Sequence, residues 1–176
     1  MQDSRNSLVS LLVVLIGGPY WWFAMEYNEF RDKLNESCEL AGLDDAVASA
    51  LFWRCEELTL SEKAVIYQEG APLDFTFGLL LSGDLIVEKG GLILGGIFEH
   101  QVFGEMAYFT NERTRTATIR VGSAQAVILK FTLTSEELSS PVFTTLRTTL
   151  ELQTWDRFVN TSQSGSEYPE IIHHWI

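Results

Sequence analysis

The chain has 176 residues, enough for one domain of ordinary size with short extensions. Hydrophobic residues make up 46% and charged residues 20%, which is typical of a folded globular protein rather than a disordered one. Twelve Lys and Arg against 24 Asp and Glu give a formal charge of −12. Such a field repels the phosphate backbone and argues against direct binding of nucleic acid. The two cysteines, Cys38 and Cys55, are too few for a disulfide framework or a four-cysteine zinc site, so we interpret them as buried free thiols in a reducing compartment.

The N-terminal segment, residues 1–25, is dominated by an apolar run. Residues 8–25 carry no charged side chain, and a helix that crosses a membrane needs about 17–25 such residues. A Gly-Gly-Pro break at 17–19 is followed by three aromatic residues at 20–22, which favour a membrane interface. We therefore predict a membrane anchor, or the last helix of a membrane region. The alternative is a hydrophobic helix docked on the domain.

Residues 26–54 are predicted to be a helical lead-in. Apolar side chains recur there every three or four positions, at Tyr27, Phe30, Leu34, Cys38 and Ala41. Gly42 would end this first helix, and a second would begin near residue 44 and run through residue 53.

From residue 55 the pattern changes to short apolar runs separated by turn residues. The runs lie at 58–60, 65–67, 77–81, 85–87, 92–98, 116–121 and 126–131. Several short strands at near-regular spacing predict a β-sandwich or β-roll. In the run 116–121 the residues alternate, with Ala117, Ile119 and Val121 expected to point inward.

Two helix signals follow the last run. Thr134 and Glu137 have the spacing of a capping box. Ser140 and Pro141 are typical of the N-cap and first position of a longer helix, which should reach about residue 159. Residues 161–176 are predicted to be a flexible tail, and the adjacent histidines in it lack a third metal ligand.

The segment 105–121 differs in charge from the rest of the chain. It holds two acidic residues and three arginines, a local charge of +1 in a chain of −12. Arg115 has a planar guanidinium suited to a phosphate, and Thr116 adds a hydroxyl. Backbone N–H groups of a short helix that begins near Gly104 would supply further donors, while Glu105 can accept from a sugar hydroxyl. The alternative is that Glu105 and Arg115 simply pair with each other.

These motifs resemble a known family. Phe-Gly-Glu-Met-Ala-Tyr-Phe at 103–109 and Arg-Thr-Ala-Thr at 115–118 follow a Ser-Gly turn at 82–83. In that order they resemble the cyclic nucleotide-binding domain of catabolite activator proteins, kinase regulatory subunits and gated channels. The resemblance covers roughly residues 45–160, with the domain itself at 55–160. It implies a mainly β fold with flanking helices: a β-roll (double-stranded β-helix, jelly-roll-like) with N-terminal helices and a C-terminal lid helix.

The resemblance also implies a ligand site in residues 103–117, the segment that we call the cassette. Glu105 would hold the ribose 2′-hydroxyl, and Arg115 and Thr116 would hold the cyclic phosphate. The remaining implied site residues are Phe103, Gly104, Met106, Ala107 and Ala117. The candidates on the lid are Leu146, Arg147 and Leu150. Arg113 is a second possible phosphate ligand in the same segment.

A regulatory sensor that binds cyclic AMP or cyclic GMP is the function that the resemblance implies. We expect no enzyme activity, metal or resident cofactor, because no nucleophile–base pair or metal-ligand set is visible. Similar domains are appended to membrane transporters and channels. With the run at 8–25, this implies a membrane-associated protein whose domain lies in the cytoplasm, the alternative being a cytoplasmic soluble protein. The alternative function is a ligand-free protein-interaction domain of the same fold.

Overall fold

The computed structural model describes residues 26–162. The apolar run at 8–25 and the tail from residue 163 lie outside the described residues, so the predicted anchor and flexible tail stay predictions, as do the domain boundaries. Within residues 26–162, none of the helices combines the length and the apolar character that a membrane crossing needs.

The lead-in contains two helices, as predicted. Helix α2 spans Tyr27–Glu36 and α3 spans Asp45–Phe52. Asp44 caps α3, because its carboxylate accepts from the backbone N–H of Val47 at 2.9 Å. Helix α2 ends at residue 36, earlier than the predicted stop at Gly42, and residues 37–42 form turns.

The prediction that both cysteines are buried is wrong. Because α2 ends before Cys38, this residue lies in the following turn and is exposed rather than on an apolar helix face. Cys55 is partly buried at the start of the first strand. Burial raises the pKa of the Cys55 thiol to about 11, so Cys55 stays protonated at neutral pH.

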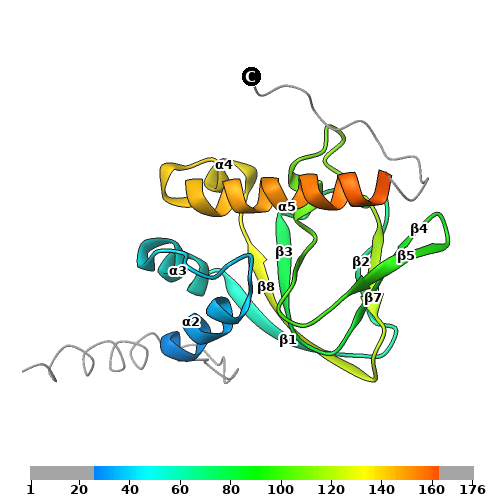
Figure 1. The fold of residues 1–176 in the computed structure, drawn as a ribbon, viewed down its shortest axis with the longest axis horizontal. Coiled ribbons are helices and arrows are strands. Elements are labelled where there is room, and N and C mark those ends of the chain that lie inside the picture. The colour runs from blue at the N-terminus through cyan, green and yellow to red at the C-terminus, as the bar shows by residue number, and fades with distance from the viewer. Residues whose placement is uncertain (1–25, 163–176) are drawn as a thin grey trace, which may run out of the picture.

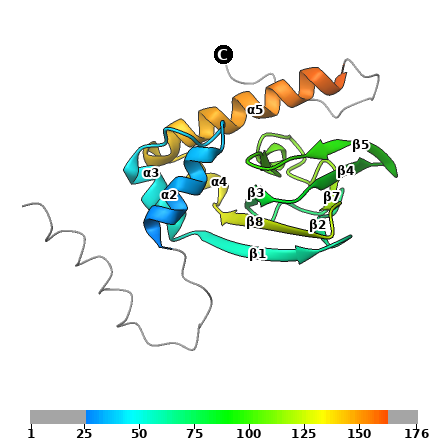
Figure 2. The same cartoon turned by 60° about the horizontal axis from the view of Figure 1, so that its bottom comes forward.

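Two four-stranded antiparallel sheets form the β-roll. The first contains, in spatial order, β1 (Cys55–Ser61), β8 (Gln125–Thr132), β3 (Thr76–Ser82) and β6 (Val102–Phe103). The second contains β2 (Val65–Tyr67), β7 (Thr118–Val121), β4 (Leu85–Lys89) and β5 (Leu92–Ile97). Figures 1 and 2 show the two sheets on opposite sides of the roll. This confirms the predicted fold class.

The core of the roll lies between the two sheets. Leu80 and Ile128 from the first sheet pack in one cluster with Leu85, Ile119 and Val121 from the second. The predicted alternation is therefore correct for Ile119 and Val121, which are buried. Strand β7 begins at residue 118, two residues later than predicted, which leaves Thr116 and Ala117 for the cassette.

A second core joins the helices to the outer face of the first sheet. Phe77 and Phe131 stack with ring centroids 4.9 Å apart, and Phe30 of α2 meets Phe131 at 6.3 Å. Leu146 and Leu150 are fully buried in the same cluster. One packed layer thus connects the N-terminal helices, the roll and the C-terminal helix.

The C-terminal elements start as predicted. The capping box of α4 (Ser135–Leu138) is formed: Thr134 Oγ1 accepts from the Glu137 N–H at 3.1 Å, and Glu137 Oε2 accepts from the Thr134 N–H at 2.9 Å. A 3₁₀ turn, η2 (Pro141–Phe143), then leads into α5 (Thr144–Ser162). Figure 1 shows α5 lying across one end of the roll, above β3.

Candidate functional site

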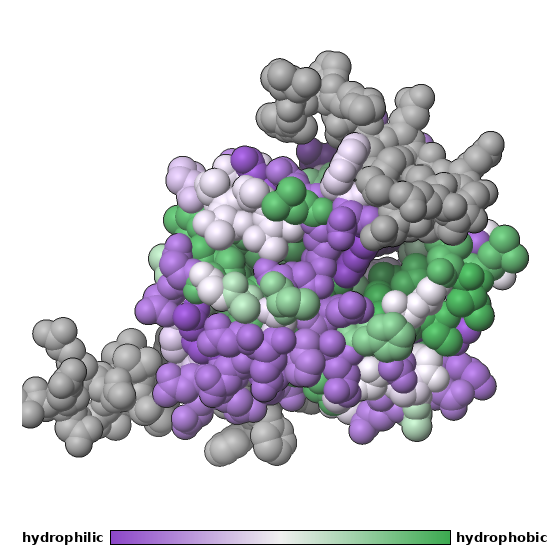
Figure 3. Space-filling model, in the orientation of Figure 1, coloured by the Kyte–Doolittle hydropathy of each residue, from purple (hydrophilic) through white to green (hydrophobic). Residues whose placement is uncertain are grey.

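A cavity of about 210 Å³ lies between the second sheet and the cassette. Its lining comes from Tyr67, Val87, residues 94–97, 104–107 and 115–117, Ile119 and Arg157. The wall formed by β4, β5 and β7 is apolar, whereas the charged side chains come from the cassette and α5. Figure 3 shows the apolar residues over the β4–β5 hairpin, where Leu92 and Ile93 are exposed. The cavity therefore has one apolar and one charged side.

The second residue of the cassette is a glycine that its backbone requires. Gly104 has φ +82° and precedes the 3₁₀ helix η1 (Glu105–Tyr108). A Cβ on Gly104 would lie 2.4 Å from Cε2 of Tyr67, much closer than real contacts allow. Only glycine combines this backbone conformation with so close an approach to the ring.

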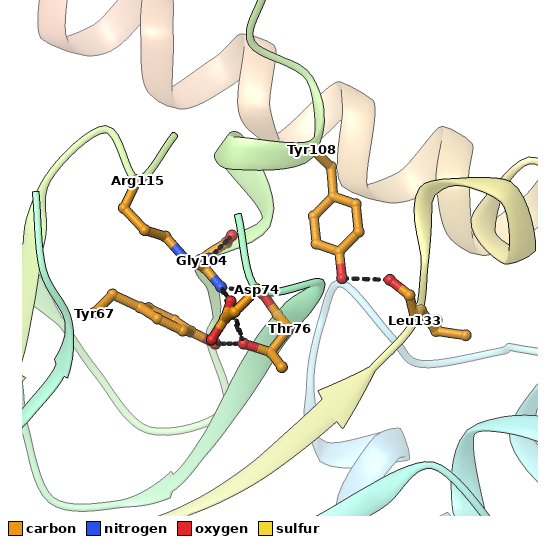
Figure 4. Close-up of polar contacts among 7 residues, drawn as sticks. All are labelled: Tyr67, Asp74, Thr76, Gly104, Tyr108, Arg115 and Leu133. Carbon is orange, nitrogen blue, oxygen red and sulfur yellow. Dashed lines mark hydrogen bonds and ion pairs between the residues drawn. The ribbon is translucent and has the colours of Figure 1, made fainter. Parts of the chain in front are cut away.

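Arg115 is held inside the protein by several acceptors (Figure 4). It is 4% exposed. Its Nη1 donates to the Gly104 carbonyl at 2.8 Å, and its Nη2 donates to the carbonyl and hydroxyl of Thr76 at 2.8 and 3.0 Å. Nη2 also pairs with the carboxylate of Asp74. The guanidinium carbon lies 3.6 Å from the ring centroid of Tyr67.

Asp74 acts as an internal counterion for Arg115. Burial raises the pKa of Asp74, but the hydrogen bonds from Arg115 and Thr76 outweigh it and hold the pKa below its ordinary value. The Asp74 side chain is 50% exposed, whereas that of Arg115 is 3% exposed. Arg115 is therefore a buried cation that is already paired with a half-exposed carboxylate.

Glu105 is fully buried, and its two oxygens have different surroundings. Oε1 accepts from Nη1 of Arg157 at 2.6 Å. Oε2 has no hydrogen-bond partner within residues 26–162. Burial raises the pKa of Glu105, although the charge of Arg157 opposes this shift. An unpaired buried acceptor is costly, so Oε2 is suited to a ligand hydroxyl that donates to it.

The raised pKa of Glu105 predicts a specific pH dependence. The folded state favours the protonated form of Glu105. The free energy of unfolding therefore decreases as the pH rises above 4.5 through the pKa of Glu105 in the folded protein. Glu105→Gln removes this loss. We expect the difference in unfolding free energy, variant minus wild type, to grow with pH in that range.

Urea unfolding of both proteins from pH 4 to 8 measures this difference. Glu136→Gln, at an exposed position of α4, is the matched control and should give a constant difference. A constant difference for Glu105→Gln as well would contradict the predicted burial effect.

The structure brings most of the predicted cassette residues together. Gly104, Glu105, Met106 and Ala107 line the cavity from one side, and residues 115–117 line it from another. Phe103 does not line it, because it is buried in the core of the roll, where its ring approaches Tyr67.

The alternative pair of Glu105 with Arg115 is not formed. Arg115 pairs with Asp74, and Glu105 pairs with Arg157. Arg113 is exposed and donates to the Ser135 hydroxyl at 3.2 Å, so it does not line the cavity.

The three lid candidates do not line the cavity either. Leu146 and Leu150 belong to the helix–sheet core, and Arg147 pairs with Glu151 on its own helix at 3.6 Å. Arg157 reaches the cavity instead: besides Glu105, it donates to the Val102 carbonyl at 2.5 Å.

Sequence reasoning missed Arg157, although a signal was present. Leu146, Leu150 and Thr154 are buried on one face of α5, and Arg157 continues this stripe by a further three positions. An arginine that continues a buried stripe is the pattern that would have identified it.

The fold and cavity define a class of protein: a β-roll with an internal cavity to which a C-terminal helix contributes a side chain. Residues 57–135 match the family model described as the cyclic nucleotide-binding domain. This match covers a little less than half of the chain and includes the segments whose motifs resemble that family. A search of curated proteins found no match.

Several solved structures have the same fold as this chain. A domain called PKAR CBD2, bound to Sp-2Cl-cAMPS, has a TM-score of 0.66 at 16% identity and covers 80% of this chain and 92% of its own. A putative cyclic nucleotide-binding protein from Geobacter metallireducens has a TM-score of 0.62 at 16% identity, with coverages of 73% and 97%. A cAMP-bound PfPKA-R has a TM-score of 0.62 at 19% identity, and the match covers 80% of this chain. This chain spans about half of the PfPKA-R chain, 48% of its length. At these identities the comparison establishes the fold.

Proposed function

We propose that this chain is a regulatory sensor module that binds cyclic AMP or cyclic GMP in the cavity and signals through its helical ends. The observation that carries the proposal is the charged side of the cavity. There, a buried carboxylate with one unpaired oxygen, Glu105 Oε2, and a buried arginine line the same space. These two groups match a sugar hydroxyl and a phosphate within one small molecule.

In the proposed complex, the charged side of the cavity binds the phosphate and ribose, and the apolar side binds the base. The cyclic phosphate interacts with Arg115 and the hydroxyl of Thr116, and the ribose lies between the phosphate and Glu105. The neutral sugar keeps the two negative charges apart. The base packs against the apolar wall of β4, β5 and β7.

Ligand binding would affect the helices through two changes in the contacts of the charged side chains. The phosphate competes with Asp74 for Arg115, and the ribose hydroxyl adds a second partner to the carboxylate that binds Arg157. Because Arg157 belongs to α5, the position of this helix is linked to occupancy of the cavity. Ligand then shifts the population of helix positions by its differential affinity for them.

Isothermal titration of the full chain with cyclic AMP and with cyclic GMP tests the proposal. We expect binding heat with the wild type and with Arg113→Ala, the exposed arginine of the same segment, but none with Arg115→Ala. Absence of heat for the folded wild type at millimolar concentrations of both nucleotides would contradict the proposal.

A ligand-free interaction domain is the second candidate, and one observation favours it. Both Nη atoms of Arg115 already have partners in Asp74, Thr76 and Gly104, so the fold balances the charge of Arg115 without ligand, although its buried Nε has no hydrogen-bond partner within residues 26–162. Failure of the titration, with the fold intact by circular dichroism, would select this candidate.

The effector in our proposal is a membrane transporter or channel. This part depends on the uncharged run at 8–25, which has the length of a membrane segment and contains aromatic residues at 20–22 that favour a membrane interface. In a flotation assay, the full chain should float with liposomes, whereas the chain that lacks residues 1–25 should stay in the lower fraction. Equal behaviour of the two chains would contradict a membrane role for this run.

A further inference from the structure

Tyr67, at the end of β2, lies beneath the two parts of the cassette that approach the anion position. It is 3% exposed, and its ring centroid is 3.6 Å from the guanidinium carbon of Arg115. The backbone of Gly104 rests on the same ring, so closely that a Cβ there would clash with it. The hydroxyls of Tyr67 and Thr76 are hydrogen-bonded at 3.1 Å. One aromatic ring thus supports both Arg115 and the start of η1 (Figure 4).

The ring and the hydrogen bonds restrain the guanidinium in different directions. Gly104, Thr76 and Asp74 accept from its Nη atoms along the edge, whereas Tyr67 contacts its face. Burial raises the pKa of Tyr67 to about 12, so its hydroxyl is neutral and supplies no countercharge to Arg115. Its contribution to Arg115 is therefore the cation–π contact and the shape of the surface.

The face contact matters most when an anion replaces Asp74. Asp74 is the half-exposed partner of Arg115, and the exchange removes it from the edge of the guanidinium. The contact with the Tyr67 ring does not depend on Asp74 and persists through the exchange. An arginine that stays in place loses less conformational entropy when the anion binds.

We propose that Tyr67 is a positioning residue that holds the guanidinium of Arg115 in the plane required for an anion in the cavity. It acts through Arg115, and its consequence for binding rests on the proposed function. Two variants separate the parts of the side chain. Tyr67→Phe keeps the ring and loses the hydroxyl, and Tyr67→Leu loses the ring face.

The first test needs no ligand. Nuclear magnetic resonance of the arginine side chains reports rotation of the Arg115 guanidinium. We expect slow rotation, with separate Nη signals, in the wild type and in Tyr67→Phe, and measurably faster rotation in Tyr67→Leu, where only the hydrogen bonds and the ion pair still restrain the guanidinium. Tyr27→Leu, in the helix–sheet core, is the control for loss of a tyrosine ring and should resemble the wild type. A rotation rate in Tyr67→Leu equal to that of the wild type would overturn the proposal.

The second test compares two ligands, cyclic AMP and adenosine, which lacks the phosphate. We expect Tyr67→Leu to weaken cyclic AMP about tenfold and leave adenosine unchanged, with rescue by Tyr67→Phe. Equal weakening of both ligands, or of neither, would overturn the positioning role while leaving the proposed function intact. If the wild type binds no cyclic AMP, the proposed function fails, and the rotation measurement alone decides whether Tyr67 holds Arg115.

Discussion

Arg115→Ala is expected to abolish cyclic nucleotide binding and to destabilise the free protein. The substitution leaves the Gly104 and Thr76 carbonyls without their donor and Asp74 without its counterion. The loss of a buried arginine of this kind costs about 3–5 kcal/mol, and the half-exposed position of Asp74 reduces this to about 2–3 kcal/mol. Urea unfolding measures the loss, and titration with cyclic AMP measures the binding.

Two further variants separate the anion site from general destabilisation. Arg115→Lys keeps the charge but lacks the planar set of donors and the flat face, so we expect binding at least tenfold weaker than in the wild type. Arg120→Ala removes a partly buried arginine of β7 that pairs with Glu88 outside the cavity. This control should lose stability and keep its affinity. Wild-type affinity in the lysine variant would show that charge alone suffices.

Asp74→Asn is expected to raise the affinity for cyclic nucleotide, about tenfold. In the proposed site the phosphate would have to displace this carboxylate from Arg115, and the asparagine would remove that competition. Without ligand, the variant should also be less stable by about 1 kcal/mol, because the buried Arg115 loses its counterion. The loss is small because Asp74 is half-exposed and solvent weakens the ion pair. Titration and urea unfolding check the two effects.

The pH dependence of Asp74→Asn has a defined sign. The folded protein holds the pKa of Asp74 below 3.8, so the stability that Asp74 contributes is present above that pH and is lost as the pH falls through the folded pKa. In Asp74→Asn, this decrease in stability at low pH should be absent. Asp84→Asn, at an exposed turn, is the matched control. Weaker binding in Asp74→Asn would mean that Asp74 supports the ligand instead of competing with it.

The local features of the chain could be predicted from their residues. The capping box at Thr134 and Glu137 depends on side chains three positions apart, and the alternation of Ile119 and Val121 depends on the pleat of one strand. Gly104 and Glu105 are adjacent, so the start of the cassette could also be placed. In each case the interacting groups are close in sequence.

The errors arose where a side chain had more than one possible environment. Cys38 had helical spacing, but α2 ended before it. Leu146 and Leu150 were correctly expected to be buried, yet the orientation of α5 packs them against the helix–sheet core rather than over the cavity. Periodicity indicates that a face is buried but does not indicate what covers it.

The sequence by itself determined the kinds of element, their order and a cassette with one glutamate and one arginine. The tertiary structure decided how these charges are paired: Arg115 with Asp74, 41 residues away, and Glu105 with Arg157, 52 residues away. An ion pair between residues so far apart in the chain requires that the fold bring them together, so no local spacing encodes it. Only the folded chain brings Arg115, Glu105 and Arg157 to one cavity.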